Sequence, residues 1–327
     1  MLWRPIALIL MLAAVPAVAD PLVHTYSIVA RDPVTGDLGV AVQSHWFSVG
    51  SVVPWAEAGV GAVATQASVD PSYGPLGLEL MRSGKSAKQA LESLLASDPQ
   101  SAFRQVAMVD SQGRVAAHTG SSTIPAAGDS QGDGFSVQAN LMRNDRIWPA
   151  MAAAFESAGG DLAERMLAAL DAAEAAGGDI RGRQSAALLI VKAKSSGSPW
   201  ADRIFDLRIE DHPEPLAELR RLVRLQRAYN HMNRGDALAA EEKWEEAMKE
   251  YRAGAELAPE IEELPYWVAV TLFTIGKEAE ALPIFRDVFA RNRDWVELTR
   301  RLPAIGFLPA DPAALERILA TAGPDTR

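Results

Sequence analysis

Hydrophobic and polar positions alternate in short runs from Thr25 to about Leu207, which is the pattern of β-strands and helices separated by turns. The first run, Thr25–Ala30, is followed by a turn-rich stretch and a second run, Leu38–Ser44, so the two predict a hairpin. Further strands are predicted at residues 59–66, 105–110, 114–119, 135–141, 185–193 and 206–210.

Two longer stretches have the spacing of amphipathic helices. One runs from Pro75 to Leu95 with a break at Gly84–Ser86, and the other runs from Trp148 to Ala176 with an interruption at Gly159–Gly160. Strand pairs separated by helical pairs predict an α+β fold, with two antiparallel sheets covered by helices rather than a parallel doubly wound sheet.

From about Pro213 onward the pattern predicts only helices, and a 34-residue repeat is visible. A small alanine followed four residues later by an aromatic residue, at this period, is typical of tetratricopeptide repeats. Such helix pairs hold a protein partner, dimerise or brace a neighbouring domain. The matched positions are Lys243, Ala247, Tyr251 and Pro259 in one unit and Lys277, Ala281, Phe285 and Arg293 in the next.

The first residues have the layout of a secretory signal. Arg4 precedes an apolar run at 6–15, and Ala17 and Ala19 place the cleavage before Asp20. The run is too short to span a bilayer of about 30 Å. We therefore expect a periplasmic or secreted protein without a membrane span after cleavage; an uncleaved anchor is the alternative. The predicted division is a signal at 1–19, an αβ domain at 20–210 and a helical domain at 211–327.

Composition narrows the function classes. The formal net charge is −10, and it becomes −11 without Arg4, the one charged residue of the signal. An acidic chain without a clustered basic face is not expected to bind nucleic acid. The chain has no cysteine, so disulfides and thiolate chemistry are excluded. The five histidines lack metal-ligand spacing, and no phosphate loop or dinucleotide fingerprint occurs, so neither metal nor cofactor is predicted.

Thr25 is the candidate nucleophile because of its position. A hydroxyl residue at the head of a first strand is the layout of enzymes whose nucleophile is the N-terminal residue, with the free α-amine as its base. This role requires a cut between His24 and Thr25, because signal cleavage leaves residues 20–24 in front; autocatalysis or another enzyme would remove them. The alternative is that Thr25 is an ordinary β-branched residue at a strand start.

The predicted hairpin brings Gln43, Ser44 and His45 beside Thr25. Adjacent residues of a strand point to opposite faces, so only one of Ser44 and His45 faces Thr25. His45 is a candidate base or orienting group, or else a structural histidine. Ser44 is a candidate contact for the substrate.

A second polar patch follows the third predicted strand. Gln66 is a candidate oxyanion donor, and the Pro- and Gly-containing loop that follows places Asp70, Ser72 and Tyr73 at a helix start, where donors bind a substrate carboxylate. Equally, Asp70 or Ser72 caps that helix.

Two further pairs are candidates for substrate recognition. Gln138 and Asn140 alternate with apolar residues, so both point to one face of their strand, where carboxamides suit an amide substrate or form a buried pair satisfied by backbone. Arg181 and Arg183 flank a glycine and are able to hold a carboxylate, or form a solvated loop pair.

Segments 25–33, 36–44, 54–66, 71–75, 135–140 and 177–186 carry several motifs in a fixed order. Together they resemble a bacterial and archaeal family catalogued as domain-of-unknown-function family 1028, over about residues 24–210. The resemblance implies a four-layer αββα sandwich of the N-terminal-nucleophile hydrolase type. Some relatives carry a peptidoglycan-binding tail, where this chain has helical repeats.

The sequence therefore predicts a hydrolase of amide bonds in a small peptide, an amino-acid derivative or a cell-wall fragment. Thr25 would attack, and Gln66 or Asn140 would stabilise the oxyanion. The rival hypothesis is a non-catalytic ligand-binding or scaffold protein whose helical repeats hold a protein partner. The sequence does not decide whether the protein forms a homo-oligomer, because the segment Val52–Trp55 fits either a core or a subunit contact.

Overall fold

The computed structural model describes residues 22–23 and 25–324. The predicted signal and the bond between His24 and Thr25 lie outside the described residues. Internal contacts divide the chain into two compact units, Met1–Leu216 and Ala217–Arg327, six residues beyond the boundary predicted from the sequence.

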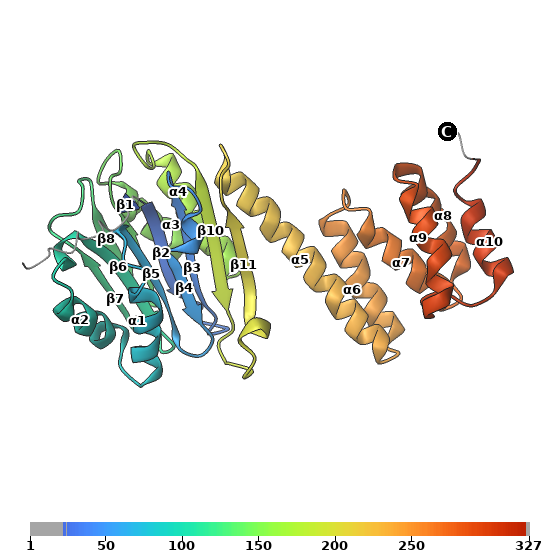
Figure 1. Cartoon of the computed structure of the whole chain (residues 1–327), viewed down its shortest axis with the longest axis horizontal. Coiled ribbons are helices and arrows are strands. Elements are labelled where there is room, and N and C mark those ends of the chain that lie inside the picture. Colours follow the sequence, from blue (N-terminus) through green and yellow to red (C-terminus); the bar gives the residue numbers. More distant parts are fainter. Residues whose placement is uncertain (1–21, 24, 325–327) are drawn as a thin grey trace, which may run out of the picture. The chain divides into compact units, whose positions relative to one another are not determined.

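A six-stranded antiparallel sheet in the first unit carries Thr25. Its strand order is β11-β10-β3-β2-β9-β8, so β2 and β3 lie at the centre (Figure 1). They form the predicted hairpin, with Thr25 directly opposite Ser44. The strands are β2 (Thr25–Arg31), β3 (Leu38–Ser44), β8 (Gly128–Gly132), β9 (Phe135–Ala139), β10 (Ser185–Val191) and β11 (Arg203–Ile209).

A five-stranded antiparallel sheet faces it, with the order β1-β5-β6-β7 and with β4 also paired to β5. Val29 and Val40 of the first sheet share a buried cluster with Ala62 and Ala107 of the second. The small alanines allow the two backbones to approach closely. The strands are β1 (Leu22–Val23), β4 (Pro54–Glu57), β5 (Gly61–Ser68), β6 (Arg104–Asp110) and β7 (Val115–Thr119).

Each sheet is covered on its outer face by a pair of helices (Figure 1). Helices α1 (Tyr73–Arg82) and α2 (Ala87–Ser97) pack on β5, β6 and β7, whereas α3 (Ile147–Ser157) and α4 (Leu162–Ala175) pack on β2, β3, β8 and β9. Ser86 forms a capping box at the start of α2, and Asp161 caps α4. The prediction of antiparallel sheets covered by helices is confirmed.

Three strands were not predicted from the sequence. β8 is polar throughout and half-exposed at a sheet edge, so it has no hydrophobic alternation. β1 has only two residues. β4 contains Trp55, whose ring lies where a side chain on Gly74 of α1 would sit. Val53, the residue before the first residue of β4, is fully buried. The segment Val52–Trp55 thus contributes to the core of the unit.

The second unit contains only helices among its described residues. Lys243 and Lys277 precede α6 and α8 at the predicted 34-residue spacing, and Ala247 and Ala281 are both fully buried. The helices are α5 (Pro215–Ala240), α6 (Trp244–Leu257), α7 (Glu263–Thr274), α8 (Glu278–Arg291), α9 (Asp294–Arg301) and α10 (Pro312–Ala320).

None of the helices in the described part of the chain combines the length and the apolar character needed to cross a bilayer.

A buried ion pair links α1, α2 and β6. Nε of Arg104 donates to Asp98 Oδ2 over 2.7 Å, and the Tyr73 hydroxyl donates to the same oxygen over 3.0 Å. Burial alone would raise the pKa of Asp98, but these bonds and one from the backbone N–H of Gln100 hold its pKa below the usual range.

The pH dependence of stability should reveal this pair. Because the folded pKa of Asp98 lies below the unfolded value of about 4, its ionised form stabilises the fold above that pH, and the contribution disappears as the pH falls through the folded value. We expect Asp98→Asn to lower the free energy of unfolding by about 3 kcal/mol at neutral pH. Urea titrations should show this difference shrinking below about pH 4. A difference independent of pH would contradict this assignment.

Candidate functional site

Thr25 begins β2 and points into the space between the two sheets. Its Oγ1 donates a hydrogen bond to Oγ of Ser44 over 3.0 Å, and both residues are fully buried. Ser44, rather than His45, is therefore the residue that faces Thr25, as the alternation of β3 requires.

The carbonyl oxygen of Thr25 is held by residues from two other parts of the chain. The backbone N–H of Asn140 donates to it over 3.1 Å, and the side chain of Asn140 donates over 3.5 Å. Nε2 of Gln66, on β5 of the facing sheet, donates to the same oxygen over 3.1 Å. In this arrangement both predicted oxyanion donors position Thr25 itself.

Gln105 on β6 joins these donors. Its Oε1 accepts from Gln66 Nε2 at 2.8 Å and from Asn140 Nδ2 at 2.9 Å. Its Nε2 lies within hydrogen-bonding distance of Thr119 Oγ1 and of the carbonyls of Gly128 and Ala139. The sequence reasoning missed Gln105, although its alternation with Ala107 and Val109 places it on the face of β6 that points toward the other sheet.

Gln138 extends the network along β9. Its Nε2 donates to Ser27 Oγ over 3.3 Å and to the carbonyl of Ala64 over 3.1 Å, and Ser27 in turn donates to Gln66 Oε1 over 2.7 Å. Gln138 and Asn140 thus point to one face, as predicted. Oε1 of Gln138 and Oγ of the neighbouring Ser136 are buried without a hydrogen-bond partner. We call the following residues the Thr25 cluster; all are fully buried and uncharged: Thr25, Ser27, Ser44, Gln66, Gln105, Gln138 and Asn140.

His45 lies at the end of β3 beside the loop that follows α4. Its Nδ1 is buried without a partner and lies 3.8 Å from the position that a Cβ would take on Gly182. Its backbone N–H donates to Asp179 Oδ2 over 3.3 Å. The ring therefore packs against the 179–183 loop, while Ser44 occupies the place opposite Thr25.

The residues at the start of α1 are engaged in local structure. Oδ1 of Asp70 accepts from the backbone N–H of Ser72 over 2.9 Å, which forms a turn before the helix. The Ser72 side chain makes no capping hydrogen bond. Tyr73 points to Asp98 on the helical side of the sheet. The structure thus separates Tyr73 from the Thr25 cluster.

Both arginines of the 181–183 loop are paired with carboxylates of the protein. Arg181 binds the buried carboxylate of Asp179 through two nitrogens, at 3.0 and 2.7 Å, and Arg183 bridges Glu174 and Glu214. Glu174 also accepts from the Tyr26 hydroxyl over 2.5 Å, and burial together with this carboxylate raises the pKa of Tyr26. These guanidinium groups are committed to the fold and hold the loop beside His45.

Leu22 and Val23, the described residues before Thr25, lie on the facing sheet. Leu22 pairs with Ser68 and Val23 pairs with Ala67, at the end of β5 just beyond Gln66. The chain therefore passes from the edge of one sheet to the centre of the other between Val23 and Thr25. Within the described residues, no group of three or more His, Asp or Glu side chains could hold a metal ion.

Comparisons with known proteins agree with this architecture. The chain is 31% identical to protein SPO2555 from Silicibacter pomeroyi, described as a DUF1028 protein; the alignment with its crystal structure covers 61% of this chain and 88% of that one, with a TM-score of 0.55. No curated protein matches the chain. The profile of a family described as "Family of unknown function (DUF1028)" matches residues 25–219, more than half of the sequence, and the match begins at Thr25. The chain therefore belongs to the DUF1028 family.

Proposed function

We propose that this protein is an exported hydrolase of amide bonds that uses Thr25 as an N-terminal nucleophile. The observation that carries the proposal is the way Thr25 is held. Ser44 contacts its hydroxyl, while Gln66 and Asn140 hold its carbonyl, so residues of β3, of β5 and of the end of β9 fix the position of Thr25. The family match begins at the same residue.

The absence of ionisable side chains in the Thr25 cluster decides which group would act as the base. The side chains of the cluster include no carboxylate, amine or imidazole, so the base would be the α-amine that a cut before Thr25 creates. The amine takes the proton of Oγ1 as this oxygen attacks the substrate carbonyl. The proton then passes to the leaving amine, and water hydrolyses the resulting ester. Gln66 and Asn140 act as positioning residues in this scheme.

Access to Thr25 depends on the segment before it. Thr25 is fully buried in the uncut chain, so a substrate cannot reach its hydroxyl. β1 pairs with β5 next to Gln66, and the family match leaves this segment out. Removal of residues 20–24 would create the α-amine and free the edge of β5 in one step.

Three exposed apolar side chains, linked through the backbone to residues of the Thr25 cluster, support a substrate with an apolar part. Phe47, Ile124 and Ile180 are 64%, 38% and 51% exposed, respectively. Phe47 lies three residues after Ser44, and backbone hydrogen bonds join both isoleucines to Leu141, next to Asn140. A small peptide, an amino-acid derivative or a cell-wall fragment with an apolar side chain would fit this chemistry.

The finer fold assignments belong to the same proposal. Two facing antiparallel sheets, each covered by two helices and with the candidate nucleophile at a strand start, support an αββα sandwich of the N-terminal-nucleophile hydrolase type. The equivalent burial of Ala247 and Ala281, and of Tyr251 and Phe285, supports a tetratricopeptide-like second unit.

A non-catalytic ligand-binding or scaffold protein is the second candidate. The observation that favours it is the complete burial and dense hydrogen bonding of the Thr25 cluster in the uncut chain, as in a structural polar core.

The N-terminus of the mature protein distinguishes the two candidates. We expect mass spectrometry of protein recovered from the periplasm or medium of an expressing cell to show Thr25 as the first residue. A fully folded product that begins at Asp20 and hydrolyses amides would overturn the mechanism. Retention of the intact N-terminus inside the cell would contradict export.

A further inference from the structure

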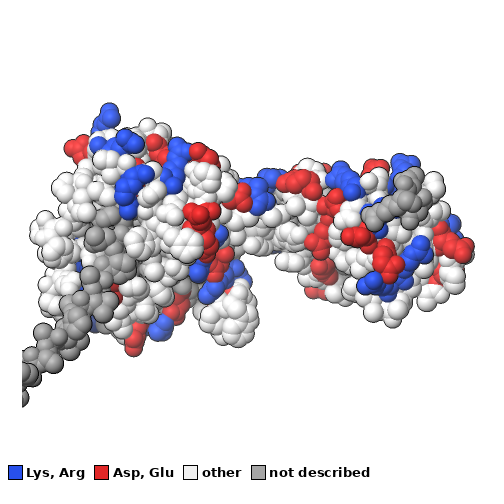
Figure 2. Space-filling model, turned by 45° about the horizontal axis from the view of Figure 1, so that its top comes forward, with Lys and Arg blue, Asp and Glu red and all other residues white. Residues whose placement is uncertain are grey.

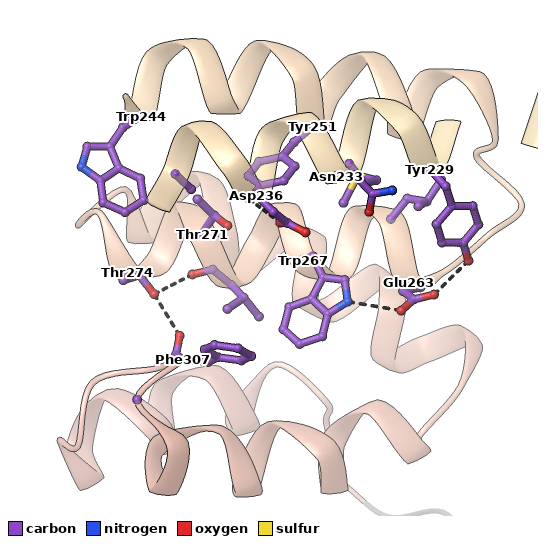
Figure 3. A pocket seen from close by; sticks show the side chains of 15 residues that line it. Tyr229, Asn233, Asp236, Trp244, Tyr251, Glu263, Trp267, Thr271, Thr274 and Phe307 are labelled. Carbon is purple, nitrogen blue, oxygen red and sulfur yellow. Dashed lines mark hydrogen bonds between the residues drawn. The ribbon is translucent and has the colours of Figure 1, made fainter. Parts of the chain in front are cut away.

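The helical unit contains a cavity of about 660 Å³, and none of its lining residues belongs to the Thr25 cluster. It lies between α5, α6, α7 and the turn at Gly306–Phe307, and all of its lining residues belong to the second unit (Figure 3). Its volume is in the range of ligand-binding pockets. Five aromatic side chains border it: Tyr229, Trp244, Tyr251, Trp267 and Phe307.

Two carboxylates lie among these aromatic rings. Asp236 Oδ1 accepts from the Tyr251 hydroxyl over 2.7 Å, and Glu263 accepts from the Tyr229 hydroxyl over 2.9 Å. In the part of the chain that the structure describes, neither carboxylate is within ion-pair distance of a lysine or arginine. A tyrosine hydroxyl, which carries no charge, therefore fixes the orientation of each side chain.

The aromatic rings add an attraction for cations. Trp267 and Phe307 meet edge to face, with ring centroids 5.9 Å apart, and Phe307 and Trp244 are 54% and 36% exposed. Figure 3 shows the rings of Trp244, Trp267 and Phe307 bordering the same space, with Asp236 and Glu263 on its walls. A ring face next to a carboxylate favours an ammonium or guanidinium group.

The cavity is elongated. Its lining residues on α5 run from Tyr229 to Ala239, and those on α7 run from Glu263 to Thr274. At the rise of an α-helix, each of these stretches is about 15 Å long. An extended peptide covers this length with four or five residues. The exposed carboxamide of Asn233 on the same face offers both a donor and an acceptor to a peptide group.

The charged residues around the cavity are mostly acidic, like Asp236 and Glu263. Residues 236–263 carry ten acidic side chains and three basic ones. Of the basic residues, Lys243 pairs with Glu241 and Arg252 pairs with Glu280. The visible face of the helical unit in Figure 2 carries a band of red acidic side chains beside blue ones. The local excess of negative charge favours a positively charged partner.

We propose that this cavity, an elongated groove along α5 and α7, binds an extended basic segment of a partner protein. An arginine or lysine side chain of that segment lies between the aromatic rings and the carboxylates of Asp236 and Glu263. This binding site does not depend on Thr25 or on any hydrolysis. The peptide-binding proposal and the hydrolase proposal are therefore tested independently of each other.

The test uses two peptides that differ only in charge. Acetyl-(Ala-Arg)₃-amide carries an arginine at every second position, and acetyl-(Ala-citrulline)₃-amide has a similar shape without the positive charge. Calorimetric titration of the full chain should show binding of the arginine peptide, and at least about tenfold weaker binding of the citrulline peptide.

Matched variants locate the binding site. The double variant Asp236→Asn/Glu263→Gln keeps the acceptors for the two tyrosines and should weaken binding of the arginine peptide by about tenfold. Asp287→Asn/Glu316→Gln removes the same charge from exposed positions outside the groove and should leave binding within about twofold. Thermal unfolding followed by circular dichroism checks that both variants are folded.

Three results would overturn the proposal. They are no binding of the arginine peptide at millimolar concentration, equal binding of both peptides, and an equal loss in the two double variants. The last result would mean that only the overall charge of the protein attracts the peptide.

Discussion

A chain produced with Thr25 as its first residue is expected to open a β-lactone probe about 10⁴-fold faster than a chain that begins at Asp20. In this reaction the Thr25 oxygen forms an ester with the lactone carbonyl, and the ring C–O bond breaks. The α-amine carries the proton to the released alkoxide. In the proposed mechanism, the shorter chain gains the α-amine and is freed of the segment that pairs with β5, while Ser44, Gln66 and Asn140 hold Thr25 in place.

Two variants of the shorter chain control this experiment. Thr25→Ala removes the nucleophile and should reduce labelling to the rate of the chain that begins at Asp20, whereas Thr25→Ser keeps a hydroxyl and should retain most of it. The increase in intact mass measures labelling without knowledge of the natural substrate. Labelling of Thr25→Ala at the wild-type rate would show that Thr25 is not the nucleophile.

Replacement of Gln105 with leucine should cause the second large effect, a loss of about 4 kcal/mol in the free energy of unfolding. Leucine has a similar size but removes the acceptor of Gln66 and Asn140 and the donor to Thr119, Gly128 and Ala139. These groups are screened from water by the two sheets, so part of their hydrogen bonding would be lost without replacement.

Ser136→Ala provides the matched control for this measurement. Ser136 is as deeply buried as Gln105, but its hydroxyl has no hydrogen-bond partner. Its removal should leave the free energy of unfolding unchanged or raise it by up to about 1 kcal/mol. Urea titrations of both variants measure the two values. A cost below about 1 kcal/mol for Gln105→Leu would show that the network does not stabilise the fold.

Much of the first unit could be predicted from the sequence because its strands carry strong hydrophobic patterns. The predicted run Leu38–Ser44 matches β3, and the Gly84–Ser86 break separates α1 from α2. β8 could not be predicted, because its residues are polar and only pairing with β9 makes it a strand. Tertiary context decides such an edge strand, not local propensity.

The candidate site was predicted in part. The hairpin register placed one of Ser44 and His45 opposite Thr25, and strand alternation placed Gln138 and Asn140 on one face of their own strand. The pairing of β9 with β2, which brings the two groups together, had no signal in the sequence. Gln105 was missed because a single glutamine at the start of a strand carries no motif. The role of Arg181 in a buried ion pair depends on Asp179, two residues earlier, and no spacing rule indicates it.

The groove of the helical unit had no signal of its own in the sequence. The repeat predicted helix pairs, but the aromatic residues that border the cavity come from three helices and one turn. Their meeting depends on how α5, α6 and α7 pack. Gly235 is buried and leaves room for the ring of Tyr251, so this contact is one of those that set the packing.

The site of the β-lactone adduct on the mature wild-type protein tests the central claim most directly. Peptide mapping by tandem mass spectrometry should place one adduct on Thr25, in a peptide that begins with this residue and has no preceding His24. An adduct on another residue, or no adduct on a chain whose first residue is Thr25, would contradict the assignment of Thr25 as an N-terminal nucleophile.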